Sequence, residues 1–463
     1  MIYGAPPMNA LNDALTRYRN RPAPTPEQVR QRSFALLFGV SVTTAIGNSG
    51  MQSVLPAIGR QIGIPDSWVA GIFSLSALFW ALVSPFWARQ SDLRGRKPLI
   101  MLGLAGFVLS MIACGAVVSA GVRHLAAPTI IFGFFLLGRA VFGLFGSASN
   151  PATQAYVAER TTREQRTQAM STLAGAFGLG TIVGPLIATL FVLPVVGLAG
   201  PLFAFAVIAA VMLLTVARWL PESKSAPAPL DAAEQRFVLA DARAEETPTD
   251  GKKPPLWRDP RLVPYLVYGF LIASCQSIIQ QILGFLIIDK VGLPPMQALD
   301  YTKMAWMTGA IAGLLAQWGL IRMFAMSPRH LLRWGAGLAA AGSLLMAFAP
   351  DYWTVVIAFA LCNLGFAFAR PGFTAGSSLA VGPSEQARAA GAIAAVNGVN
   401  IILAPFFVEL YGRIHIAPFL VTMAVLFGLM VFAFLHPGLR RAGENPASEA
   451  DATISMLERS DEG

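Results

Sequence analysis

The sequence has 463 residues, of which 55% are hydrophobic and only 13% are charged, whereas soluble globular proteins carry about a quarter charged residues. Apolar runs of about twenty residues, the length that a helix needs to cross a bilayer, recur along the chain, and their continuity excludes the alternating pattern of a membrane β-barrel. The net charge of +9 lies in short segments between these runs, so it indicates membrane topology rather than nucleic-acid binding.

The apolar runs predict an all-α membrane protein with about twelve transmembrane helices in two six-helix halves. Residues 1–33 contain five arginines, several prolines and no apolar core, which favours a cytoplasmic arm over a signal peptide. The first half, residues 34–221, contains predicted helices at 34–57, 68–88, 97–119, 128–158, 166–193 and 199–219.

A polar, Pro-rich and charged stretch at residues 222–260 follows, and its composition predicts a linker between the halves. The second half, residues 261–437, contains predicted helices at 262–288, 301–323, 329–349, 353–380, 386–412 and 415–436. Residues 438–463 form a short acidic tail that we expect to lie in the cytoplasm.

Basic residues gather in every second loop between the predicted helices, as at residues 89–97, 160–166 and 322–333, and they are few in the other loops. Cytoplasmic loops carry this excess of Lys and Arg. Both termini and the linker are therefore expected in the cytoplasm, with the protein in the inner membrane.

Several classes of chemistry find no support in the sequence. The three cysteines lie inside apolar runs, and the four histidines lie at helix ends or in loops, which argues against a disulfide framework, a metal site or a haem site. No Gly-rich loop followed by Lys-Ser or Lys-Thr is present to cradle the phosphates of ATP. We therefore predict no enzyme activity, no cofactor and no metal, and partners limited to a small-molecule substrate, protons and lipid around a monomer.

The two halves share a repeated pattern, which in secondary transporters often surrounds a binding site at the membrane midplane. An amide, a Ser, two apolar residues and a Gln occur at residues 48–52 and again at residues 276–280. The prolines at 151 and 185 have counterparts at 371 and 405 at the same interval. Together these matches favour a duplicated six-plus-six arrangement.

The loop after the second predicted helix carries the clearest motif, because residues 88–97 read ARQSDLRGRK. This segment resembles motif A of the major facilitator superfamily, although Ala stands for the leading Gly and Leu for the usual Arg. Gly permits a tight turn there, and the charges can hold one conformation. The competing interpretation is a topology-determining loop alone. The resemblance predicts a conformational gate formed by Asp92, Gly95, Arg96, Lys97 and the Glu159 carboxylate at the end of the fourth helix.

Arg139 lies about ten residues inside an apolar run, where a charge is costly and usually faces the bundle interior. Its surroundings, LGRAVFG at residues 137–143, resemble motif B of the same superfamily, which implies a role in proton coupling. The alternative is an arginine that extends toward the membrane interface. No Asp or Glu lies deep in the predicted helices 1, 2, 5, 7 or 8, so the candidates for the acid that titrates are Asp92, Glu159 and Glu409. Of these, we place Glu409 with Arg139 in proton coupling.

The fifth predicted helix reads GAFGLGTIVGP at residues 175–185. It resembles motif C, the Gly-rich signature associated with antiporters of the superfamily, although Ala188 and Thr189 replace the trailing Gly pair. Gly180 and Gly184 offer a smooth face for close helix packing, and Pro185 permits a kink. Ordinary small-residue packing is physically the same arrangement, so only the resemblance connects this helix with export.

Polar side chains on the first and fourth helices of each half, which line the central cavity in this superfamily, are candidates for the substrate path. For each of them, hydrogen bonding between packed helices is the competing interpretation. Arg370 lies deep in its helix and could attract an anionic substrate group. The residues on these helices are Asn48, Gln52, Asn150, Gln276, Gln280, Asn363 and Arg370, and Asn397 and Asn400 of the run at 386–412 extend the set.

The resemblance as a whole, close in the first half and mainly topological in the second, points to the drug:proton antiporter branch. It implies proton-coupled efflux of a small amphipathic compound by alternating access of the two halves. Two alternatives stay open: an importer or exporter of a specific metabolite such as a siderophore, and a transporter-like membrane sensor.

Overall fold

The computed structural model describes residues 25–161, 163–192, 197–222, 259–381, 393 and 403–440. Within these ranges every regular element is a helix, as predicted. The first half consists of α2 (Pro26–Ile62), α3 (Asp66–Arg94), α4 (Arg96–Val122), α5 (Pro128–Phe145), η1 (Gly146–Ala148), α6 (Ser149–Glu159), α7 (Arg163–Leu190) and α8 (Gly200–Trp219). The second half consists of α10 (Val263–Val291), α11 (Pro295–Leu314), η3 (Leu315–Leu320), α12 (Ile321–Met323), α13 (Pro328–Ala347), α14 (Tyr352–Leu379), α16 (Ala404–Arg413), α17 (Ala417–Leu435) and α18 (Pro437–Arg440).

Local signals set several helix ends. The Thr25 side chain accepts a hydrogen bond from the Gln28 backbone, the Gln28 side chain accepts one from the Thr25 backbone, and this capping box starts α2. Gly63 ends α2 in the left-handed conformation at φ 84°. The Asp351 side chain caps α14 by accepting from the backbone N–H of Thr354 at 2.8 Å, and this hydrogen bond lowers the pKa of its carboxyl group.

Two predicted helices are interrupted. The run at 128–158 is α5 and α6 joined by the 3₁₀ turn η1, and the run at 301–323 contains the π-helical turn η3. Of the run at 386–412, only residues 393 and 403–412 are among the described residues, and these include most of α16. Most of residues 1–33, the linker 222–260 and the tail 438–463 also lie outside the described residues.

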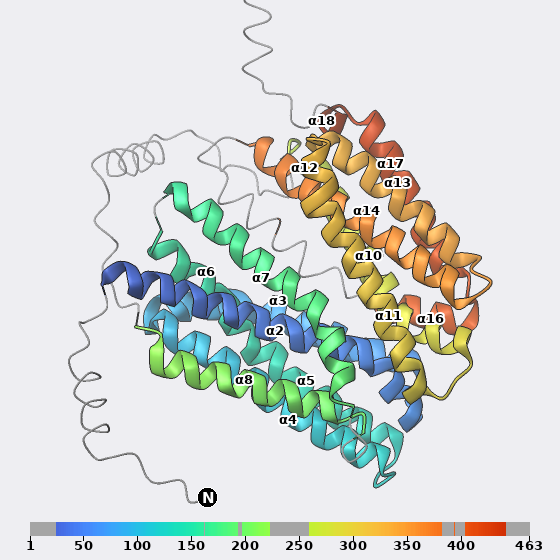
Figure 1. Ribbon diagram of the computed structural model, residues 1–463, viewed down its shortest axis with the longest axis horizontal. Helices are drawn as coiled ribbons and strands as arrows, with labels where there is room; N and C mark the ends of the chain where they lie inside the picture. Colours follow the sequence, from blue (N-terminus) through green and yellow to red (C-terminus); the bar gives the residue numbers. More distant parts are fainter. Residues whose placement is uncertain are drawn as a thin grey trace, which may run out of the picture.

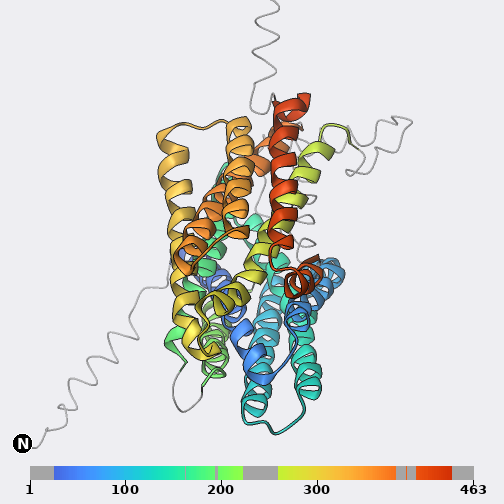
Figure 2. The ribbon, with the colours of Figure 1, turned by 90° about the vertical axis from the view of Figure 1, so that its right-hand side faces the viewer.

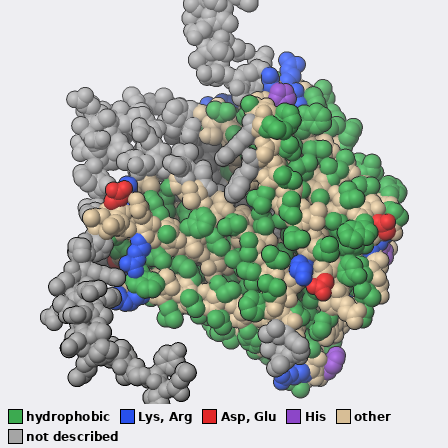
Figure 3. Space-filling model, in the orientation of Figure 1, with side chains coloured by type: hydrophobic (Ala, Val, Ile, Leu, Met, Phe, Trp, Pro, Cys, Tyr) green, Lys and Arg blue, Asp and Glu red, His purple; other side chains and the backbone are tan. Residues whose placement is uncertain are grey.

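The helices form two bundles that lie side by side, α2–α8 and α10–α18 (Figures 1 and 2). By length and composition, eight helical spans in the described part of the chain can cross a membrane. Hydrophobic side chains cover most of the face in Figure 3, with few charges among them, and a surface of this kind is suited to contact with lipid.

Candidate functional site

The two ends of the bundles carry different charged clusters. We call them the Arg60 end, where α2 finishes, and the Arg96 end, where α3 turns into α4. Gly95 makes that turn at φ 95°, in a region that favours glycine. Arg96 is the first residue of α4 and its side chain is only 13% exposed.

The Arg96 guanidinium joins three elements of the first half. Its Nη1 lies 2.5 Å from Asp92 Oδ1 and donates to Ser91 Oγ at 3.0 Å, both on α3. Its Nη2 lies 2.5 Å from Glu159 Oε1 at the end of α6. A guanidinium fork that holds two carboxylates is a strong arrangement. The predicted gate residues Asp92, Arg96 and Glu159 therefore lie together, and we call them the clasp.

Lys97 and Gly95 extend the clasp toward α8. The Lys97 ammonium donates to the backbone carbonyl of Ala217 at 2.8 Å. The Glu222 carboxylate lies beside the turn at Gly95, since a Cβ at that position would be 2.6 Å from one of its oxygens. All of these contacts lie within the first half, and the clasp therefore fixes the helices of one bundle at the Arg96 end.

The Gly-rich segment of α7 packs directly on α2. A Cβ on Gly180 would lie 2.6 Å from the Ala45 Cβ, and one on Gly184 would lie 2.1 Å from Ser49 Oγ. Ser49 Oγ also donates to the Gly180 carbonyl at 3.2 Å. Pro185 lies inside α7 one residue beyond this contact. Gly180 and Gly184 thus allow two helix backbones to approach closely.

Gly184→Ala is therefore expected to destabilise the protein, because the added methyl group meets Ser49 and the α2 backbone. Overpacking of this kind costs about 1–3 kcal/mol, and we expect a lower Tm of the purified protein. Gly178→Ala on the same helix is the control, since a Cβ there meets nothing within 4 Å. Equal Tm values for the two variants would contradict the close packing of α7 on α2.

Arg139 is buried in α5, with an exposure of only 2%, so it does not extend to the membrane interface. Its Nη2 donates to Asn48 Oδ1 on α2 at 3.2 Å. Its guanidinium carbon lies 4.7 Å from the ring centroid of Phe142 and 5.5 Å from that of Phe73, which allows cation–π attraction. Among the described residues, its Nε and Nη1 have no hydrogen-bond partner.

The structure does not bring the two proposed proton-coupling residues together. Glu409 lies on α16, where Arg413 Nη2 is 3.1 Å from its Oε1 and Ser67 of α3 is a further hydrogen-bond partner. Arg139 forms no ion pair in the described part of the chain. Glu409 therefore belongs to the contacts between the halves at the Arg60 end.

The candidate cavity residues differ in what they contact. Asn48 is held by Arg139 and donates to the Thr44 carbonyl at 3.1 Å. Asn363 donates to the Phe359 carbonyl within its own helix at 2.9 Å. Gln52, Gln276 and Gln280 are half-buried, Asn150 and Arg370 are exposed, and Asn397 and Asn400 lie outside the described residues.

A charged cluster that the motifs did not indicate joins the two halves at the Arg60 end. The Arg60 guanidinium pairs with Asp66 of its own half at 2.8 Å and with Asp289 of α10 in the other half. The Tyr411 hydroxyl of α16 donates to Asp289 Oδ2 at 2.6 Å. His415 Nε2 lies 4.0 Å from the same oxygen. We call Arg60, Asp66, Asp289 and Tyr411 the interhalf lock.

The internal repeat contains a signal for this cluster. Asp289 follows Arg60 by 229 residues, nearly the separation of the repeated amide patterns at 48–52 and 276–280. Pro56 of α2 and Gly284 of α10 occupy equivalent positions in the two repeats, and they are in contact, because a Cβ on Gly284 would lie 2.6 Å from Pro56 Cγ. Alignment of the two halves would have placed Arg60 opposite the end of α10.

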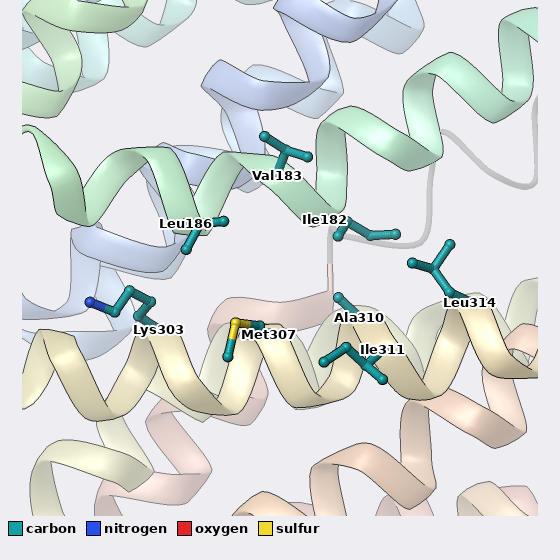
Figure 4. Close-up of a pocket in the computed structure, with 8 residues that line it drawn as sticks. All are labelled: Ile182, Val183, Leu186, Lys303, Met307, Ala310, Ile311 and Leu314. Carbon is teal, nitrogen blue, oxygen red and sulfur yellow. The ribbon is translucent and has the colours of Figure 1, made fainter.

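The halves are in contact toward the Arg60 end and diverge toward the other end. α2 packs on α10 and α11, α7 on α11, and α3 on α16. At the Arg96 end, α6 and the first turns of α7 diverge from α12 and the end of α14 (Figure 1). A small apolar pocket of about 70 Å³ lies between α7 and α11, and among its lining residues Lys303 is the charged one (Figure 4). The two halves are therefore held together at the Arg60 end by the interhalf lock.

Comparison with known proteins gives consistent matches. A sequence model of the Major Facilitator Superfamily matches residues 37–405. A class H tetracycline resistance protein from Pasteurella multocida is 21% identical over 88% of this chain and 96% of its own length. A class C tetracycline resistance protein from Escherichia coli is 24% identical over 89% of this chain and 98% of its own.

Solved structures share the arrangement of the two bundles. A bacterial homologue of the human lysosomal transporter Spinster, solved in an inward-facing and unoccupied conformation, superposes with a TM-score of 0.65. The match covers 92% of this chain and 100% of that one, at 15% identity. At this identity the likeness concerns the fold alone.

Proposed function

This chain belongs to the Major Facilitator Superfamily of membrane transporters, and on that premise we propose that it exports small amphipathic compounds in exchange for protons. Membership confirms the predicted all-α membrane fold and the prediction of a transporter rather than an enzyme. The relatives are named for tetracycline resistance, which supports export of a drug-like compound. The Gly-rich segment of α7, which resembles the antiporter motif, supports the same direction.

The observation that carries the mechanism is the interhalf lock at a single end of the molecule. Alternating access requires two bundles that close at one end while they part at the other. We assign the Arg96 end to the cytoplasm, because the basic loops gather there. The structure then corresponds to a state closed to the outside, and rocking of the halves would break the Arg60–Asp289 pair and close the Arg96 end.

Proton coupling rests in this proposal on Arg139 and Asn48. An arginine held in the bilayer without a carboxylate partner is costly, and such residues generally serve ion or substrate pathways. Its positive charge disfavours protonation of nearby groups, so it would assist proton release when a proton-carrying acid approaches during the conformational change.

A second candidate function is transport of a specific metabolite with an anionic group. The exposed Arg370 on α14, directly before Pro371, favours it, because a guanidinium binds carboxylates and phosphates in a fork geometry. Arg370→Gln separates the two candidates: loss of transport of anionic compounds alone would favour the metabolite transporter.

The function is tested by proton flux in proteoliposomes that contain a pH dye, with tetracycline, lipophilic cations and siderophores as trial compounds. The control is a double variant, Arg60→Cys with Asp289→Cys. A cleavable thiol cross-linker between the two cysteines holds the halves together, so the same protein is measured before and after cleavage. We expect compound-driven proton flux that stops on cross-linking and returns on cleavage. Compound movement at the same rate with and without a pH gradient would contradict proton coupling.

A further inference from the structure

A groove separate from the transport pathway opens at the Arg96 end, between the start of α2 and the end of α8. Its volume is about 320 Å³, and it is lined by Gln28, Val29 and Arg32 of α2 and by residues 218–221. The two helices pack side by side in the first bundle (Figure 1). The groove is therefore built from elements that the clasp and the α7 packing hold in place.

Two arginines of the groove are available to bind an anion. Arg32 and Arg218 are both exposed, and neither forms an ion pair in the described part of the chain. The Arg32 guanidinium carbon lies 5.1 Å from the centroid of the Trp219 ring. Stacking on an aromatic ring orients a guanidinium and leaves its N–H edge free for a phosphate.

The groove lies where the lipid-facing surface of α8 ends. Val207, Val211 and Leu214 follow one another along one face of α8 and are 63%, 58% and 68% exposed. Arg218 continues the same face by one turn, and Trp219 beside it is 49% exposed. A basic residue and a tryptophan after an apolar lipid-facing stripe are typical of the headgroup level of a membrane.

We propose that this groove binds the phosphate group of an anionic phospholipid through Arg32 and Arg218, with Trp219 at the level of the headgroups. The lipid is favoured over a soluble phosphate because Arg218 extends a face that is otherwise apolar and exposed. The assignment to the cytoplasmic leaflet rests on the orientation proposed above. A lipid here would also brace α8 one residue from Ala217, which accepts the Lys97 hydrogen bond of the clasp.

The test uses the full chain, purified in detergent, with phosphatidylglycerol or phosphatidylcholine titrated and adducts counted by native mass spectrometry. We expect tighter binding of phosphatidylglycerol than of phosphatidylcholine. The double variant Arg32→Gln with Arg218→Gln should weaken it by about 25-fold, since each arginine contributes about fivefold. Arg123→Gln is the matched control, since Arg123 is exposed at the opposite end of the bundle. Trp219→Ala keeps both charges and should weaken binding less than the double variant.

Three outcomes would overturn the proposal: equal binding of the two lipids, unchanged binding in the double variant, or displacement of phosphatidylglycerol by millimolar inorganic phosphate. An unchanged Tm of the lipid-free double variant verifies that it folds. Lipid binding is measured without any transport substrate. A failure of proton-coupled export would therefore leave this result standing, and a failure of lipid binding would leave the export proposal intact.

Discussion

Asp289→Asn is expected to open the outer side of the transporter more often. The substitution removes the charge that holds Arg60 across the two halves, while Asn keeps the shape and can still accept from Tyr411. Because the side chains are 22% and 30% exposed, we expect the pair to contribute about 1–2 kcal/mol to the closed state. The open population should rise by about 5- to 30-fold.

A cysteine in place of Pro56 reports this opening, because Pro56 is buried where α2 meets Gly284 of α10. Its labelling by a membrane-impermeant maleimide from the outside should be faster by the same factor in the Asp289→Asn background. Asp300→Asn is the control, since Asp300 is 77% exposed and its ion pair, at 2.9 Å, is with Lys303 of its own helix. Identical labelling rates in the two backgrounds would show that Asp289 does not hold the halves together.

Arg139→Met is expected to lower the transport rate by about 100-fold or more, while the protein stays folded. Methionine is unbranched and apolar and packs well against aromatic rings, and Phe73 and Phe142 flank this position. Because the charge of Arg139 is buried and no carboxylate in the described part of the chain pairs with it, its removal should leave Tm unchanged or raise it. Higher stability combined with lost transport is a pattern that a purely structural arginine would not produce.

The matched variant is Arg123→Met, which removes an exposed charge after α4 and should alter neither Tm nor transport. Transport is measured as substrate-driven proton flux, and Tm on the same preparations. A fall in Tm together with intact transport in Arg139→Met would assign Arg139 to packing alone.

The helices were predictable from the sequence because lipid requires each spanning segment to satisfy its own backbone hydrogen bonds. The break between α5 and α6 was not, since it depends on packing between helices. A Cβ on Gly103 of α4 would lie 2.4 Å from the Ser149 Cβ, and one on Gly106 would lie 2.6 Å from the Phe145 Cβ. These contacts bring η1 against α4, and no local signal in residues 146–148 announces them.

The candidate site also contains one part that the sequence predicted and one part that it did not. Asp92 and Arg96 lie four residues apart in a recognisable motif, so the clasp could be anticipated from the sequence. The lock joins residues 229 positions apart, so no local motif announces it, and only an alignment of the two repeats could have indicated it. For the same reason the sequence could not determine that Glu409 faces Ser67 of the other half rather than Arg139.

The central claim, rocking of two halves about a lock at one end, is tested most directly by distances between pairs of spin labels. One pair, at Arg123 and Met296, spans the halves at the Arg60 end, and a second pair, at Arg94 and Phe324, spans them at the Arg96 end; all four side chains are exposed. With transported substrate and a proton gradient, we predict that the first distance lengthens while the second shortens. Distances that stay fixed, or that change in the same direction at both ends, would contradict alternating access.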